Sequence, residues 1–232
     1  MRNVIASIVL TVLTLPAILV LLLSALLRRP EAFLAYGVWT MRVGQRLLGI
    51  TVEAEGRDRL DRRTPYVFMC NHLSFLDAPA LVTVIDRPVR SIVKRFVFRI
   101  PVFGWGMRLA GFVPVDKEGI GEGRKRIARA SGLIREKGYS FLVFPEGQRS
   151  WDGRLQPFRR GGFFLALEAG APIVPVSIAG TFELMPRVSR RVRRGHVRIV
   201  FHEPIAAADF SPETLPELME RVRAAIASGL TS

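Results

Sequence analysis

The pattern of apolar and polar positions divides the chain into two parts, a long uncharged N-terminal run and a region of short alternating segments. Residues 4–27 contain no charged side chain. A helix rises about 1.5 Å per residue, so this run extends about 36 Å, enough for a hydrocarbon core of about 30 Å. We therefore predict a membrane helix here, transmembrane or re-entrant, in which Pro16 is tolerated as a kink.

A cleaved signal peptide is the alternative interpretation of this run. A signal peptide has a shorter apolar core and a small-residue cleavage site, whereas here Arg28 and Arg29 follow the run directly. These two arginines outnumber Arg2 on the other side. The charge distribution predicts that the domain after the run lies on the cytoplasmic side, and we expect the membrane to be a cell inner membrane.

Residues 31–48 carry apolar side chains at helical spacing, interrupted by arginines. An interfacial helix, the second arm of a helical hairpin and an ordinary amphipathic helix packed on the domain all fit this pattern. We assign residues 1–48 to a membrane anchor and residues 49–232 to one globular domain.

Beyond Gly49, short β-rich runs alternate with helical stretches. This alternation predicts an α/β fold, a single layered domain with a mostly parallel sheet flanked by helices. The predicted strands are 51–54, 66–70, 89–93, 141–144, 173–178 and 197–201. The predicted helices are 78–85, 123–137, 161–169 and 213–227.

Composition narrows the classes of partner. The 34 Lys and Arg residues against 20 Asp and Glu give a net charge of +14, which attracts nucleic acid or an anionic membrane surface. The uncharged run favours the membrane, and the chain lacks a recognisable nucleic-acid-binding module. A basic, membrane-tethered nucleic-acid-binding protein is therefore a distant alternative. The arginine-rich stretch 187–194 is expected to contact anionic headgroups or an acidic carrier protein, or to form a solvated loop.

The first candidate site is a histidine followed five residues later by an aspartate. His72 and Asp77 pair if the chain turns into a helix between them, with Ser74 as the N-cap. The carboxylate would then fix the imidazole tautomer and leave the other ring nitrogen basic. Such a base can take the proton of a hydroxyl that attacks a carbonyl carbon.

Other interpretations of this segment exist. Ser74 is an alternative nucleophile for a covalent mechanism, and a histidine in such a position often has only a structural role. We interpret Cys70 as a small apolar strand residue. As the single cysteine, it excludes an intrachain disulfide and a cysteine-rich metal site.

The second candidate site follows the predicted strand 141–144. Gly147 allows a close backbone approach to a ligand, and Arg149 offers a planar fork suited to a phosphate. Glu146 is expected to orient that arginine or to bind a substrate hydroxyl, although a solvated surface turn is the alternative. Lys94 and Lys117 are further candidates for contact with the phosphate.

Together these segments resemble the 1-acylglycerol-3-phosphate O-acyltransferase (lysophosphatidic acid acyltransferase) family. Asn71–Asp77 resembles its NH-x4-D block, and Phe144–Ser150 resembles its FPEG-x-R-S block. Further similar blocks lie at 100–104, 111–117 and 173–177, in the family's order. The chain has Lys117 where the family usually has Arg, and Gln148 where Thr is common.

The resemblance implies a glycerolphosphate acyltransferase-like fold and phosphatidic acid synthesis for phospholipid biosynthesis. The expected acyl donor is acyl-CoA or acyl-carrier protein, with no cofactor or metal, and the acceptor is the sn-2 hydroxyl of 1-acyl-glycerol-3-phosphate. The alternatives are another lysolipid acceptor and a membrane-bound thioesterase, in which water replaces the lipid hydroxyl. His72 is implied to be the general base, oriented by Asp77. The residues implied to engage the glycerol phosphate are Lys94, Lys117, Glu146, Gly147 and Arg149.

Overall fold

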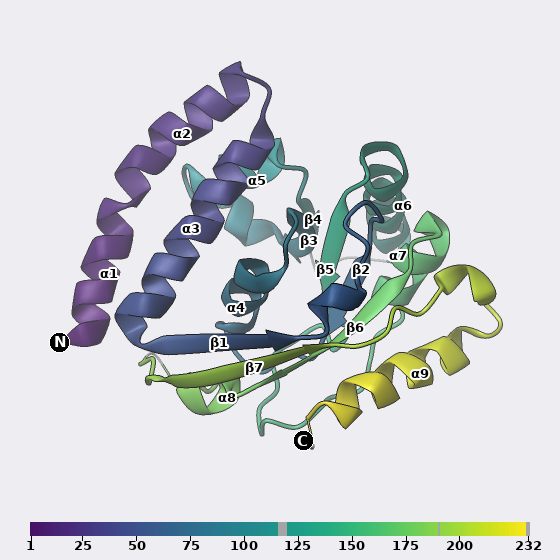
Figure 1. Cartoon of the computed structure of the whole chain (residues 1–232). Helices are drawn as coiled ribbons and strands as arrows, with labels where there is room; N and C mark the ends of the chain where they lie inside the picture. The colour runs from purple at the N-terminus through teal and green to yellow at the C-terminus, as the bar shows by residue number, and fades with distance from the viewer. Residues whose placement is uncertain (116–119, 190, 231–232) are drawn as a thin grey trace.

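The computed structural model describes residues 1–115, 120–189 and 191–230. Within these ranges, seven strands form one sheet in the order β1-β7-β6-β2-β5-β3-β4 (Figure 1). The strands are β1 (Ile50–Glu55), β2 (Val67–Cys70), β3 (Val89–Lys94), β4 (Val113–Val115), β5 (Ser140–Val143), β6 (Ile173–Ala179) and β7 (Gly195–Phe201).

The sheet is mostly parallel, as the sequence predicts. Strands β6, β2, β5, β3 and β4 run in one direction, whereas β7 is antiparallel to β6 and parallel to β1. All six predicted strands are present, with ends shifted by a residue or two.

Helices cover both faces of the sheet, so the central strands are buried on both sides. In β2, Val67 and Met69 pack on the side of α6, α7 and α9, while Phe68 and Cys70 pack on the side of α4. This burial explains why β2 reads as a continuous apolar run rather than an alternating one. The helices that follow β1 in the chain are α4 (Asp77–Val84), α5 (Phe103–Leu109), α6 (Ile120–Lys137), α7 (Gly161–Ala169), α8 (Thr181–Leu184) and α9 (Leu215–Ser228).

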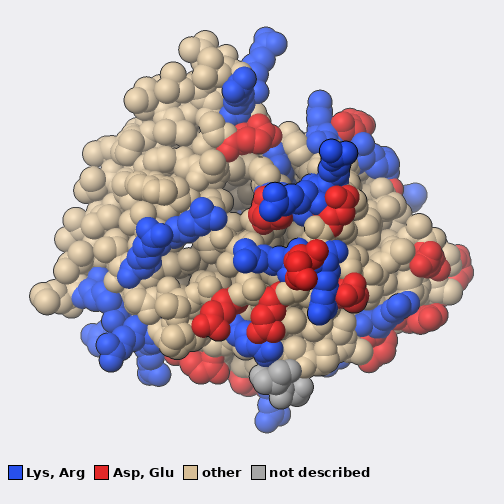
Figure 2. Space-filling model, in the orientation of Figure 1, with Lys and Arg blue, Asp and Glu red and all other residues tan. Residues whose placement is uncertain are grey.

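The uncharged N-terminal run forms two consecutive helices, α1 (Arg2–Val12) and α2 (Thr14–Leu26). The interruption at Leu13 follows from Pro16, which has no N–H to donate to the carbonyl of Val12. Together these helices are long and apolar enough to cross a membrane, and only 11% of their most apolar window is buried. Figure 2 shows that the surface over α1 and α2 is almost free of charged side chains.

Helix α3 (Pro30–Leu48) folds back along α1 and α2 as the second arm of a hairpin (Figure 1). The hydroxyl of Tyr36 donates to the carbonyl of Leu13 at 2.6 Å, which ties α3 to the interruption between α1 and α2. The other side of α3 packs on α4, where Gln45 donates to the carbonyl of Pro79 at 3.1 Å. Of the alternatives for residues 31–48, the structure shows the second arm of a helical hairpin, which also packs on the domain.

A buried arginine links this hairpin to the sheet. Arg90 in β3 is 2% exposed, and burial lowers the pKa of its guanidinium. Its Nε donates to the carbonyl of Ala110 at 2.9 Å, and its Nη2 lies 3.1 Å from a carboxylate oxygen of Glu31 in α3. The guanidinium also stacks on Tyr139, with Cζ 3.4 Å from the ring centroid. The start of α3 is thus anchored to the sheet by a charged side chain that apolar periodicity does not reveal.

Candidate active site

The sheet order brings the two candidate sites together. His72 follows β2 and the turn containing Glu146 follows β5, and these strands are direct neighbours running in the same direction. Lys94 is exposed at the end of β3, the next strand along the sheet. We call the end of the sheet where these strands finish the catalytic edge. Lys117 lies outside the described residues.

The predicted His72–Asp77 pair forms. Nδ1 of His72 lies 2.7 Å from Oδ2 of Asp77, the fully buried first residue of α4. The same oxygen accepts the backbone N–H groups of Leu73 at 2.7 Å and Ser74 at 2.8 Å. A carboxylate at a helix N-terminus is also favoured by the helix dipole. With Nδ1–H donated to this carboxylate, Nε2 of the imidazole is the basic nitrogen.

Ser74 is not the N-cap that the sequence suggests. Helix α4 has Leu76 at its N-cap, and Ser74 lies two residues earlier. Its hydroxyl accepts the N–H of Leu76 at 3.2 Å and donates to the carbonyl of Met185 at 2.7 Å. The carboxylate of Asp77 folds back on the preceding turn and satisfies its N–H groups. Because Ser74 is fully buried and its proton is engaged, the geometry disfavours it as a nucleophile.

The imidazole is held in place by an aromatic neighbour. The ring of Phe144 stacks on that of His72, with centroids 4.0 Å apart and an interplanar angle of 19°. The side chain of His72 remains 21% exposed, so a ligand can still reach it. The role of Phe144 has no signal in the sequence, where it reads only as the last apolar residue of a strand.

Glu146 joins the two motifs through their backbones. Its Oε1 accepts the N–H of His72 at 2.6 Å, and its Oε2 accepts the N–H of Gln156 at 2.8 Å. Burial raises the pKa of this carboxyl from 4.5 to about 7, against the lowering effect of the two backbone N–H groups. These contacts give Glu146 a positioning role toward the backbone of His72. The sequence suggested contact with Arg149 or a substrate hydroxyl and did not anticipate this role.

Gly147 occupies a position that requires glycine. Its φ is +72°, in the left-handed region, and its N–H closes a turn by donating to the carbonyl of Phe144 at 3.0 Å. A Cβ atom at this position would lie 2.8 Å from Cδ of Arg159. The turn therefore brings bare backbone close to a cationic side chain, an arrangement suited to an anionic ligand.

Arg149 lies near the His72–Asp77 pair. Its Cζ is 3.5 Å from the ring centroid of Phe75, which lies between His72 and Asp77 in the sequence. The next residue, Ser150, donates its N–H to the carbonyl of His72 at 2.8 Å. Burial lowers the pKa of Arg149, and the negative charge of Asp77 acts in the opposite direction. A base and a guanidinium thus share one site.

Comparison with known proteins identifies the family. Residues 51–179 match the family model described as Acyltransferase, and this range includes both candidate motifs. The chain belongs to the acyltransferase family.

Several relatives of this chain are 1-acyl-sn-glycerol-3-phosphate acyltransferases. The chloroplastic BAT2 enzyme of Brassica napus is 40% identical over 143 residues, which cover 61% of this chain and 41% of the relative. The human alpha enzyme is 30% identical over 177 residues, or 76% of this chain and 62% of the relative. The chain thus spans less than two thirds of the length of these relatives.

A solved structure shares the fold of this chain over nearly its whole length. The 1-acyl-sn-glycerophosphate acyltransferase PlsC of Thermotoga maritima superimposes with a TM-score of 0.79. The match covers 99% of this chain and 96% of that one, at 23% sequence identity. It therefore includes the N-terminal hairpin.

Two residues beside the His72–Asp77 pair support the candidate site from within the core. Cys70 is fully buried, and burial raises the pKa of its thiol well above the usual value, in keeping with its interpretation as a core residue. Asn71 exchanges two hydrogen bonds with the backbone of Ile178 in β6, at 2.9 and 2.8 Å. Asn71 therefore clamps the chain just before His72, a role that sequence reasoning missed.

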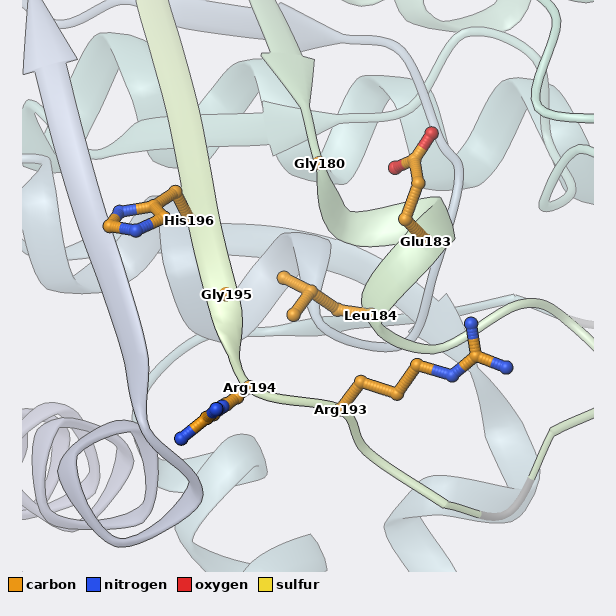
Figure 3. Close-up of a pocket in the computed structure, with 7 residues that line it drawn as sticks. All are labelled: Gly180, Glu183, Leu184, Arg193, Arg194, Gly195 and His196. Carbon is orange, nitrogen blue, oxygen red and sulfur yellow. The ribbon is translucent and has the colours of Figure 1, made fainter.

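A surface depression of about 520 Å³ lies at the start of β7, beside α8. Its lining includes Glu183, Arg193, Arg194 and His196, whose side chains point in different directions (Figure 3). His196 turns toward β1, where its Nδ1 lies 2.6 Å from the hydroxyl of Thr51. The depression does not include the catalytic pair, so we do not place the reaction there. Among the described residues, no cluster of His, Cys, Asp or Glu side chains could hold a metal ion.

Proposed function

We propose that this protein transfers a fatty acyl group from acyl-CoA or acyl-carrier protein to the sn-2 hydroxyl of 1-acyl-glycerol-3-phosphate, giving phosphatidic acid. One observation carries the proposal: the His72–Asp77 pair and the guanidinium of Arg149 lie in a single site, bridged by Phe75. The names of the relatives agree with this acceptor.

In the proposed reaction, Nε2 of His72 takes the proton of the acceptor hydroxyl as its oxygen attacks the thioester carbonyl. Asp77 holds the tautomer and stabilises the imidazolium that forms. The tetrahedral intermediate then collapses, the C–S bond breaks, and the imidazolium returns the proton to the departing thiolate. Arg149, with Gly147 and the exposed Lys94, holds the phosphate so that the hydroxyl stays near the base.

We propose that the hairpin of α1, α2 and α3 inserts its apolar outer surface into the cytoplasmic leaflet of a cell inner membrane. The exposed apolar side chains of α1 and α2 support insertion, because contiguous apolar surface of this kind marks contact with lipid or protein. Arg28 and Arg29 lie at the turn of the hairpin, where they can contact anionic headgroups. Acceptor and product would then never leave the bilayer surface.

The test uses the purified full chain in detergent with one acyl-CoA. With lysophosphatidic acid, the expected product is phosphatidic acid in an amount equal to the thiol released. His72→Ala should lose nearly all turnover while remaining folded, and Arg149→Ala should chiefly raise the Michaelis constant for the acceptor. Release of free fatty acid at the same rate with and without the acceptor would instead identify a thioesterase.

A further inference from the structure

Arg187, in the loop after α8, is held against Arg149. Its Nη1 donates to the carbonyl oxygen of Arg149 at 2.5 Å, and Nη1 of Arg149 lies 3.5 Å from the carbonyl oxygen of Arg187. The two residues are 38 positions apart in the chain, and each side chain reaches the backbone of the other. The exchange brings the two guanidinium groups within electrostatic reach of each other at the catalytic edge.

Each guanidinium also lies on an exposed aromatic ring. Cζ of Arg149 is 3.5 Å from the centroid of Phe75, and Cζ of Arg187 is 3.8 Å from the centroid of Trp151. The two rings are 62% and 63% exposed. A ring supports the flat face of a guanidinium and leaves the remaining N–H groups free for a ligand. Both cations are therefore held in fixed orientations.

The pair carries two positive charges close together, which is unfavourable without a compensating anion. The charge of Arg187 contributes to the lowered pKa of Arg149, after the larger effect of burial. Across the described ranges, none of the ion pairs that the structure contains involves Arg149 or Arg187. A ligand with two negative charges would balance the pair.

A phosphate monoester is such a ligand, because it carries about −1.5 to −2 charges at pH 7. A phosphodiester carries only one negative charge and has one oxygen blocked by its second substituent. Two planar forks can each make paired hydrogen bonds to the three free oxygens of a monoester. The charge and the geometry of the arginine pair therefore both match the headgroup of lysophosphatidic acid better than that of other lysophospholipids.

We propose that Arg187 binds the acceptor phosphate together with Arg149 and makes the site selective for a phosphate monoester over a phosphodiester. This inference rests on the proposed acyl transfer and specifies its acceptor headgroup. Arg187 lies outside the residues matched by the family model, 51–179. It lies in the loop between α8 and β7.

The test compares the wild-type protein with Arg187→Gln, using one acyl-CoA and two acceptors, lysophosphatidic acid and lysophosphatidylglycerol. Arg187→Gln should lower kcat/KM for the monoester by about tenfold to a hundredfold, the usual loss of a charged hydrogen bond. The value for the diester should change little, so the ratio of the two should fall. Arg191→Gln is the matched control, because it removes the same charge from an exposed position in the same loop.

Arg187→Lys separates charge from geometry, and it should keep part of the preference for the monoester. An equal loss with both acceptors would overturn the inference in favour of a structural or donor-binding role, as would an unchanged ratio. If the wild-type protein acylates neither acceptor, the proposed function fails, and the inference fails with it.

Discussion

Glu146 allows the link between burial and active-site structure to be measured. The residue is 2% exposed, and its carboxyl group accepts the N–H of His72 and the N–H of Gln156. Glu146→Gln keeps the shape but offers one oxygen to two donors. The buried N–H left without an acceptor should cost about 1–3 kcal/mol.

The pH dependence of this cost follows from the raised pKa. Between pH 4.5 and about 7 the folded protein holds the Glu146 proton, whereas the unfolded chain releases it. Rising pH therefore favours unfolding across this window. The stabilisation is complete below 4.5, the pKa of the carboxyl in the unfolded chain, and it is lost as the pH rises to about 7, the pKa in the folded protein. The rise from 4.5 to about 7 corresponds to about 3 kcal/mol. Glutamine does not titrate, so the variant lacks this loss.

The assay is equilibrium unfolding in urea at several pH values from 4.5 to 7.5, in detergent and followed by tryptophan fluorescence. The free-energy difference between the wild-type protein and Glu146→Gln should shrink by about 3 kcal/mol as the pH rises through this range. Glu217→Gln, at an exposed position, should leave the pH dependence unchanged. A constant difference between wild type and Glu146→Gln would refute the reasoning, because it would mean that Glu146 is ionised throughout and that its backbone hydrogen bonds outweigh burial.

Four further substitutions test other parts of the structure. Asp77→Asn should lower kcat by about 10³- to 10⁴-fold, because an amide can present its N–H to Nδ1 of His72 and favour the wrong tautomer. Steady-state kinetics measure this effect, and a loss of less than tenfold would contradict the role of the pair. Gly147→Ala should destabilise the protein by about 1–2 kcal/mol, because a Cβ is unfavourable at this positive φ. Urea unfolding measures this loss of stability, and a variant as stable as the wild-type protein would argue against the turn geometry. Arg90→Met should lower the free energy of unfolding by about 2–4 kcal/mol, because it leaves buried carbonyl groups without a donor. Glu31→Gln, at the half-exposed end of the same ion pair, should lower it by less than about 1 kcal/mol. Equal losses of stability in thermal or urea unfolding would contradict this difference.

The central strands of the sheet could be predicted because they are buried on both faces. The run 66–70 is continuously apolar and the run 173–178 is interrupted only by Ser177, and each has a polar or glycine-containing segment directly after it. The pairing of His72 with Asp77 was also predictable, since only a short turn separates them. In each case the deciding information is local, lying within a few residues of the chain.

The parts that sequence reasoning missed all depend on contacts between distant segments. Glu146 accepts an N–H from a residue 74 positions away, and Asn71 binds backbone 107 positions away. Arg187 reads in the sequence as one arginine among many, and only folding sets it against Arg149. Ser74 was misassigned because a serine before a helix usually caps it, whereas here the carboxylate of Asp77 satisfies the same backbone groups.

The reversed direction of β1 and β7 has a consequence for substrate delivery. Because β1 runs opposite to β2, the chain enters the sheet from the catalytic edge, so Gly49 at the end of α3 lies on the same side of the sheet as His72. In an all-parallel sheet that junction would lie a full strand length away, about 20 Å. The topology thus fixes the height of His72 relative to the hairpin. In the membrane arrangement proposed above, a lysolipid in the same leaflet would need only lateral diffusion to reach this base.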